Sequence, residues 1–214
     1  MQVSVIITNY NYARYLARAI RSVFGQSISR DKFELILVDD ASTDKSMDVI
    51  DSYKDLITVV RLKKNVGLAE ARNIGIRRSK GMYVVFLDAD DYMHSETLRM
   101  QETFLTENNR LNAVAVDYYL VNEFGDHESW ASSEKDPIAC GVMFRKDLLF
   151  DIGLYDKKFK AREEEDLRIR FLKKYSIFHI PLPLYRYRKH GANLTNNKAT
   201  MKAYSKMLRQ KHKL

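Results

Sequence analysis

The chain has 214 residues, which suits one domain of ordinary size with a substantial hydrophobic core. Its single cysteine, Cys140, excludes an internal disulfide framework and a CxxC metal site, and we expect it to be a small core residue. The net charge is +8, but the excess lies at one end, because residues 167–214 carry 13 lysines and arginines and no acidic residue.

Strand and helix patterns alternate through the first 91 residues. Apolar runs typical of buried strands occupy 3–8, 33–38, 57–62 and 82–87. The segments between them predict helices ending at Gly25, at about Tyr53 and near Gly81. Three such crossovers favour a mainly parallel sheet.

The pattern loosens beyond Asp91. Helices are predicted at 95–108, 145–151 and 163–174, and strands at 113–119, at 141–144 and around Ile177 and Tyr185. Residues 123–135 are polar and predict a long loop that contains the only tryptophan, Trp130.

An acidic cluster made of Asp88, Asp90 and Asp91 follows the fourth apolar run directly. Carboxylates so close together repel one another unless a cation lies among them. Because the carboxyl ends of parallel strands meet at one edge, we expect a single crevice there. Its expected members are Thr8, Tyr10, Asp40, Asp88 and Asp90.

These residue types suit a base, a ribose and a metal ion. An aromatic ring can stack on a base, a carboxylate can accept hydrogen bonds from a base or a ribose, and one acid can hold a hard divalent cation. No Walker loop and no GxGxxG motif follows the first strand, which counts against NTPases and dehydrogenases.

Ordered motifs carry a resemblance over most of the chain. They are VSVIITNYN at 3–11, VDDASTD at 38–44, NVGLAEARNIGIRRSKG at 65–81, FLDADD at 86–91, CGVMFRK at 140–146, GLYDKKF at 153–159, EED at 164–166 and YRYRKHGANLT at 185–195. With these motifs the chain resembles the family 2 glycosyltransferases.

The resemblance implies the α/β fold named GT-A, a Rossmann-like α/β/α sandwich with a mainly parallel, mixed central sheet. It implies inverting transfer of a sugar from a nucleotide diphosphate donor, which we expect to be a UDP-sugar, to a hydroxyl of a glycan, glycolipid or glycoprotein precursor. A divalent cation, Mn²⁺ or Mg²⁺, is the implied cofactor. The alternative is a nucleotide-sugar-binding protein of the same fold without turnover.

The expected domain organisation is one GT-A domain over residues 1–195, followed by a basic helical tail over 196–214. Within the domain, residues 1–91 form the nucleotide-binding half and residues 92–195 the acceptor and catalytic half.

Carried over position by position, the resemblance also implies roles for single residues. The nucleotide-binding positions are Thr8, Tyr10, Asp40, Arg72 and Asp88. Asp90 and His190 are the implied metal ligands, with Asp91 either a less favoured ligand or a helix cap, and Arg188 and Lys189 are the implied diphosphate-binding residues.

The base that takes the acceptor proton is implied to be Asp166, with Glu165 orienting the acceptor or the donor sugar. Repulsion among the four acids at 163–166 can raise one pKa toward a useful value, although a solvated helix start has the same composition. Trp130, Tyr118 and Tyr119 are sugar-stacking candidates or core residues.

The basic tail places Met201, Tyr204 and Leu208 at helical spacing among lysines and arginines. This pattern fits a short interfacial helix at the inner face of a membrane, and packing against the domain explains it equally well. No apolar run is long enough for a membrane span and no signal region precedes the first strand, so we expect a cytoplasmic protein. A nucleic-acid partner is not expected, because it leaves the acidic crevice unexplained.

Overall fold

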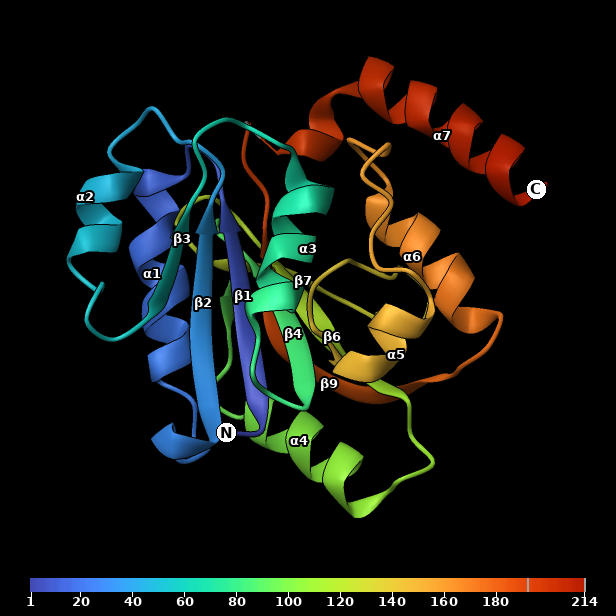
Figure 1. Cartoon of the computed structure of the whole chain (residues 1–214), viewed down its shortest axis with the longest axis horizontal. Helices are drawn as coiled ribbons and strands as arrows, with labels where there is room; N and C mark the ends of the chain where they lie inside the picture. The colour runs from blue at the N-terminus through green and yellow to red at the C-terminus, as the bar shows by residue number, and fades with distance from the viewer. Residues whose placement is uncertain (192, 214) are drawn as a thin grey trace.

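A computed structural model describes residues 1–191 and 193–213 of the chain. A nine-stranded mixed sheet lies at its centre, with helices on both faces (Figure 1). The strand order is β3-β2-β1-β4-β8-β6-β9-β5, and β7 pairs with β6 outside this path. This arrangement confirms the α/β fold with a mixed central sheet that the sequence predicts.

The first half of the chain builds the parallel part of the sheet. Its strands are β1 (Val3–Asn9), β2 (Phe33–Asp39), β3 (Thr58–Arg61) and β4 (Tyr83–Asp88), with β1 pairing in parallel with both β2 and β4. The connecting helices are α1 (Ala13–Phe24), α2 (Ser46–Asp51) and α3 (Leu68–Arg78), and a short 3₁₀ turn, η1 (Arg30–Lys32), precedes β2. Because the chain winds outward from β1 and then returns to β4, the strand order reverses beside β1, where such sheets open a crevice.

The second half adds mixed strands and the remaining helices. Its strands are β5 (Tyr92–Met93), β6 (Ala113–Val121), β7 (His127–Ala131), β8 (Val142–Arg145) and β9 (Ile177–Arg188). Its helices are α4 (Thr97–Glu107), α5 (Lys146–Asp151), α6 (Glu163–Leu172), η2 (Leu194–Asn196) and α7 (Lys198–His212). β8 runs antiparallel to β4 and β6, whereas β9 runs parallel to β6.

Two sequence predictions in this half are wrong in part. The segment expected as a loop contains β7, which is held because buried Asp117 accepts hydrogen bonds from Trp130 Nε1 at 3.0 Å and from the Ser133 amide at 2.8 Å. The two final strands are one long strand, β9, whose register against β6 shifts around Pro183. Proline cannot donate to a strand ladder, so the apolar pattern looks interrupted there.

The basic tail forms α7, which lies against the amino end of α6 (Figure 1). Its apolar side faces the domain: Leu208 is buried, the Tyr204 ring lies 6.2 Å from the Phe159 ring, and Arg162 donates to the Met201 carbonyl at 3.3 Å. Packing on the domain therefore explains the apolar spacing. Among the described residues, no helix is long and apolar enough to cross a membrane.

Gly81 occupies a position where the chain comes close to another strand. Its amide donates to Ser4 Oγ at 2.9 Å, and a Cβ atom there would lie 2.7 Å from the Ser4 backbone nitrogen and 2.8 Å from the Gln2 carbonyl oxygen. The start of β4 can therefore approach β1 only with glycine at this position.

We expect Gly81→Ala to lower the free energy of unfolding by about 1–3 kcal/mol, because backbone atoms must move to admit the methyl group. Urea denaturation followed by circular dichroism measures the change. Gly25→Ala is the matched control, since its Cβ would lie 3.4 Å from the Arg21 carbonyl oxygen, an ordinary van der Waals contact. Equal losses of stability in the two variants would contradict the close approach at Gly81.

Candidate active site

The carboxyl ends of β1, β2 and β4 bring the expected nucleotide-binding residues to one edge of the sheet. Thr8 lies in register with Val38 of β2 and Asp88 of β4. Tyr10 follows β1 and is 45% exposed, so its ring is open to a ligand. The structure thus gathers Thr8, Tyr10 and Asp88 around one edge.

Asp40 stands at the same edge but already has protein partners. Its two carboxylate oxygens accept the amides of Val66 at 2.7 Å and Gly67 at 2.9 Å, which fixes the loop that begins α3. Burial raises the pKa of Asp40, and these two amide hydrogen bonds partly oppose the rise. A carboxylate has further lone pairs, so Asp40 can still accept a hydrogen bond from a ligand.

The three acids after β4 have different environments. Asp91 is buried and accepts hydrogen bonds from the Tyr185 hydroxyl at 2.6 Å and the Arg188 amide at 2.7 Å. Burial, followed by the negative charges of Asp90 and Asp88, holds the pKa of Asp91 well above its usual range. Asp91 therefore anchors the end of β9 and is neither a helix cap nor open to a ligand.

Asp90 and His190 come together although they lie 100 residues apart in the chain. His190 Nε2 lies 2.9 Å from Asp90 Oδ2, and the Asn193 amide donates to the same oxygen at 3.3 Å. Burial raises the pKa of Asp90, as does the charge of Asp88, while the hydrogen bond from His190 lowers it.

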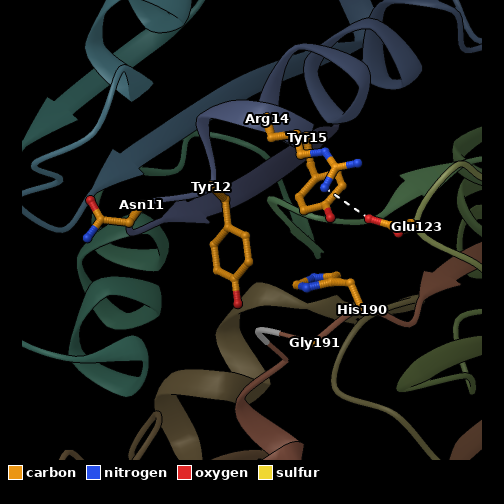
Figure 2. A pocket seen from close by; sticks show the side chains of 7 residues that line it. All are labelled: Asn11, Tyr12, Arg14, Tyr15, Glu123, His190 and Gly191. Carbon is orange, nitrogen blue, oxygen red and sulfur yellow. Dashed lines mark ion pairs between the residues drawn. The ribbon is translucent and has the colours of Figure 1, made fainter.

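A pocket of about 300 Å³ opens beside His190 (Figure 2). The His190 ring stacks on Tyr15 with 4.8 Å between centroids and meets Tyr12 edge-on at 5.7 Å. Arg14 and Glu123, which also line the pocket, form an ion pair at 2.9 Å. The pocket thus joins α1, the loop after β6 and the segment after β9.

The residues at this edge fit a divalent cation held jointly with a ligand. Within residues 1–191 and 193–213, no three histidine, cysteine, aspartate or glutamate residues converge into a complete metal site. Asp90 and His190 could nevertheless supply one oxygen and one nitrogen ligand, and burial, together with the neighbouring acids, raises the pKa of Asp90 and Asp91. Mg²⁺ commonly binds through one or two protein carboxylates plus substrate phosphates, so this donor set suits a metal–diphosphate complex.

A buried arginine connects this edge to α6. Arg72 lies on α3, and its guanidinium pairs with Asp88 at 2.8 Å and with Glu163 at 2.8 Å. Burial raises the pKa of Glu163, although the charge of Arg72 opposes the rise. Because the Arg72 side chain is turned inward and engaged, its expected role as a direct base contact does not fit its geometry, and it positions Asp88 and Glu163 instead.

The acids at the start of α6 separate into two environments. Burial, and then the charge of Glu163, raises the pKa of half-buried Glu164 to about 7. Asp166 faces α7 and accepts from Arg170 at 2.8 Å, from Lys211 at 2.6 Å and from His212 at 2.8 Å.

These contacts argue against Asp166 as the base. Burial alone would raise the pKa of Asp166, but the hydrogen bonds from Lys211, Arg170 and His212 together lower it. Its side chain is fully buried and cannot meet an acceptor hydroxyl. Glu164, by contrast, has a raised pKa, which is a property expected of a base. The i,i+4 spacing of Asp166 and Arg170 was the sequence signal for a structural ion pair.

Three further expected residues also have defined places. Arg188 is buried and donates to the carbonyls of Asp90 at 2.7 Å and Glu123 at 2.7 Å, so it is not open to a diphosphate as expected. Lys189 is exposed, and Glu165 pairs with Arg162 at 2.5 Å. Sequence reasoning missed Glu163, Glu164 and Asn193.

The aromatic candidates for sugar stacking differ in exposure. Trp130 is 56% exposed, and its indole nitrogen is held by Asp117. Tyr118 is buried with its hydroxyl bonded to the Asp136 carbonyl at 2.9 Å, and the Tyr119 ring stacks on His127 at 4.4 Å. Trp130 is therefore the most open of the three.

Comparison with known proteins identifies the family of the chain. Residues 4–169 match the family model described as glycosyl transferase family 2. The chain belongs to this family. Among curated relatives of this family 2 glycosyltransferase, the poly(ribitol-phosphate) beta-N-acetylglucosaminyltransferase TarP of Staphylococcus aureus is 34% identical over 79% of this chain and 52% of its own. The chain thus spans about half the length of that relative.

Solved structures show the same fold. The structure of Staphylococcus aureus TarS in complex with UDP-GlcNAc superposes with a TM-score of 0.80 at 23% identity, over 92% of this chain and 61% of that one. The Pyrobaculum calidifontis mannosyltransferase PcManGT, in complex with GDP-Man and Mn²⁺, gives a TM-score of 0.74 at 21% identity, over 94% and 60%. The expected fold of the family 2 glycosyltransferase is confirmed.

In this family 2 glycosyltransferase, neighbouring acids should respond differently to truncation. We expect Asp91→Ala to lower the free energy of unfolding by about 2 kcal/mol, because the buried Tyr185 hydroxyl loses its acceptor. Asp90→Ala should cost less than half as much, since it also removes a charge that Asp91 repels. Urea denaturation of both variants measures the difference, and a larger loss for Asp90→Ala would contradict the anchoring role of Asp91.

Proposed function

We propose that the chain is an inverting, metal-dependent glycosyltransferase that moves a sugar from a UDP-sugar to a hydroxyl of a glycan, glycolipid or glycoprotein precursor. The observation that carries this proposal is the chain of contacts from Asp88 through Arg72 to Glu163, beside Glu164. It joins the nucleotide edge to a carboxylate whose pKa lies near 7, so donor and base stand on one rigid frame.

The donor half of the proposal rests on the carboxyl edge of the parallel strands. Tyr10 would stack on the base, Asp40 would accept from the base, and Thr8 and Asp88 would lie by the ribose. Exposed Lys189 is the cation left for the diphosphate, since Arg188 is engaged with carbonyls. The names of TarP and TarS support a UDP-sugar donor, because both are called N-acetylglucosaminyltransferases.

Asp90 and His190 would hold the divalent cation, with Asn193 fixing the Asp90 carboxylate. When bound, the cation would neutralise the charge that develops on the leaving diphosphate. The Mn²⁺ in the PcManGT complex supports this assignment.

Glu164 would be the base that takes the proton from the acceptor hydroxyl as the hydroxyl oxygen attacks the anomeric carbon. Attack from the face opposite the diphosphate inverts the configuration at that carbon. Its pKa of about 7 lets Glu164 be ionised before the transfer and still hold a proton afterwards. Asp166, the base expected from sequence, would instead fix α7 to α6.

Isothermal titration of UDP, GDP and dTDP tests the donor and metal assignments. We expect UDP to bind with Mn²⁺ present, and we expect Asp90→Ala to weaken this binding at least tenfold, because the diphosphate loses its shared cation. Asp48→Ala, at an exposed position of α2, is the matched control and should bind UDP normally. Absence of binding for every nucleotide diphosphate, with and without Mn²⁺, would overturn the proposal.

Kinetics of Glu164→Gln and Asp166→Asn test the base. We expect Glu164→Gln to lower kcat by about 10²–10⁴-fold with donor binding intact, and Asp166→Asn to retain most of the activity. Since the base must be deprotonated, kcat of the unaltered enzyme should rise with pH through about 7, and this rise should be absent in Glu164→Gln. The reverse pattern would return the role to Asp166. Donor binding with no turnover in the unaltered protein would favour the non-catalytic alternative.

The cellular location is also proposed. We place the enzyme in the cytoplasm, with any contact at the inner face of the membrane made through the tail. The contacts of α7 support an electrostatic membrane contact only, since its apolar side faces the domain.

A further inference from the structure

The outward side of α7 carries a single row of cations. Its members are Lys198, Lys202, Lys206 and Arg209, spaced by three or four residues, with Lys213 just past the end of the helix, and all are exposed. This spacing places side chains on one face of a helix. In the part of the chain that the structure describes, none of these cations pairs with a carboxylate, and the sequence has no acid after Asp166.

The inward side of α7 is fixed by different residues. Lys211 pairs with Asp156 at 2.9 Å and with Asp166 at 2.6 Å, and His212 lies 2.8 Å from Asp166. Leu208 is buried beneath the helix. Lys211 and His212 thus fix the carboxyl end of α7 to the domain, and the outward row lies on the opposite side of the helix.

The row starts next to the candidate active site. Asn193 bonds to Asp90 at 3.3 Å and Asn196 donates to the His190 carbonyl at 3.0 Å, so the segment leading into α7 is held against the metal-ligand candidates. From there α7 runs outward to the end of the chain (Figure 1). At about 1.5 Å per residue, the row extends for about 22 Å from the site.

We propose that this row is a track for the acceptor, and that the acceptor is a linear polyanion with repeated phosphodiester groups. The inference rests on the proposed transfer to a hydroxyl and names the class of polymer that carries it. Successive cations rise by about 5–6 Å along the helix, so each can meet a separate phosphate of an extended chain. A polymer bound along α7 would have its end or a middle unit beside the metal-ligand candidates Asp90 and His190.

A lipid surface fits the same cations less well. Interfacial helices bury a row of large apolar side chains in the membrane, and the described residues of α7 expose none of these. A single row of charges also matches a line of phosphates better than a plane of headgroups. Binding to anionic lipid is therefore an outcome that the test must separate.

The test variant is Lys202→Glu/Lys206→Glu/Arg209→Glu, which reverses the middle of the row and leaves Leu208, Lys211 and His212 in place. The matched control is Lys32→Glu/Lys54→Glu/Arg110→Glu. Those cations are exposed, precede β2, β3 and β6 at the opposite edge of the sheet, and give the same change in net charge. Circular dichroism and urea denaturation confirm that both variants are folded.

The probe is fluorescently labelled poly(ribitol phosphate), with binding to the whole chain followed by anisotropy. We expect the test variant to bind it at least tenfold more weakly and the control to bind within about twofold of the unaltered protein. The dependence of log K on log salt concentration should become shallower by about two to three units in the test variant only, because fewer counterions are released. Ribitol 5-phosphate, with one phosphate, should bind all three proteins equally weakly.

The readouts separate this proposal from the proposed function. UDP binding and the slow hydrolysis of a UDP-sugar by water should be unchanged in the test variant, because they need only the donor site. If the unaltered protein neither binds UDP nor hydrolyses a UDP-sugar, the transferase proposal is wrong. The polymer-binding measurement would still test the cation row independently of that result.

Two outcomes would overturn the track. One is equal polymer binding by the test and control variants. The other concerns vesicles of phosphatidylglycerol and phosphatidylcholine. If the unaltered protein binds these vesicles, and the test variant loses vesicle binding but keeps polymer binding, the row belongs to a membrane-contact surface. Loss of polymer binding with no vesicle binding by any of the three proteins supports the track.

Discussion

The buried guanidinium of Arg72 is the contact on which the candidate site depends. It forms ion pairs of 2.8 Å with two carboxylates from distant parts of the chain, Asp88 at the end of β4 and Glu163 at the start of α6. Removing one member of a buried ion pair is strongly destabilising, because the partner is left as an uncompensated charge. The same pairs fix the start of α6, which carries Glu164, relative to the end of β4. The stability of the fold and the geometry of the candidate site therefore depend on the same charges.

Negative charge is distributed unevenly around this contact, and the distribution divides the acids by role. Asp91 and Asp166 are satisfied by protein donors and hold β9 and α7 in place. Asp90 and Glu164 keep raised pKa values, because burial and neighbouring acids disfavour their ionised forms. A cation and a proton are the ligands that such groups bind most favourably. The proposed metal–diphosphate complex and the proposed proton transfer depend on these raised pKa values.

Much of the fold could be predicted from the chain. The apolar runs that became β1, β2 and β4 are buried on both faces, and their crossovers force parallel pairing, so periodicity alone located the acidic edge. β7 could not be predicted in this way, because its polar strand is held by buried Asp117 from a neighbouring strand. The long strand β9 was divided in prediction because Pro183 interrupts its pattern.

The sequence by itself determined the strands and the mainly parallel pairing of residues 1–91, the resemblance to the family, and the residue types that gather at the carboxyl edge. Only the tertiary structure decided which acid of the run 163–166 pairs with Arg72 and which faces α7. A helix turns about 100° per residue, so neighbours in that run point to different surroundings, and the partners Arg72, Lys211 and His212 come from distant segments. A pKa depends on such partners in space, and the order of residues along the chain does not specify them.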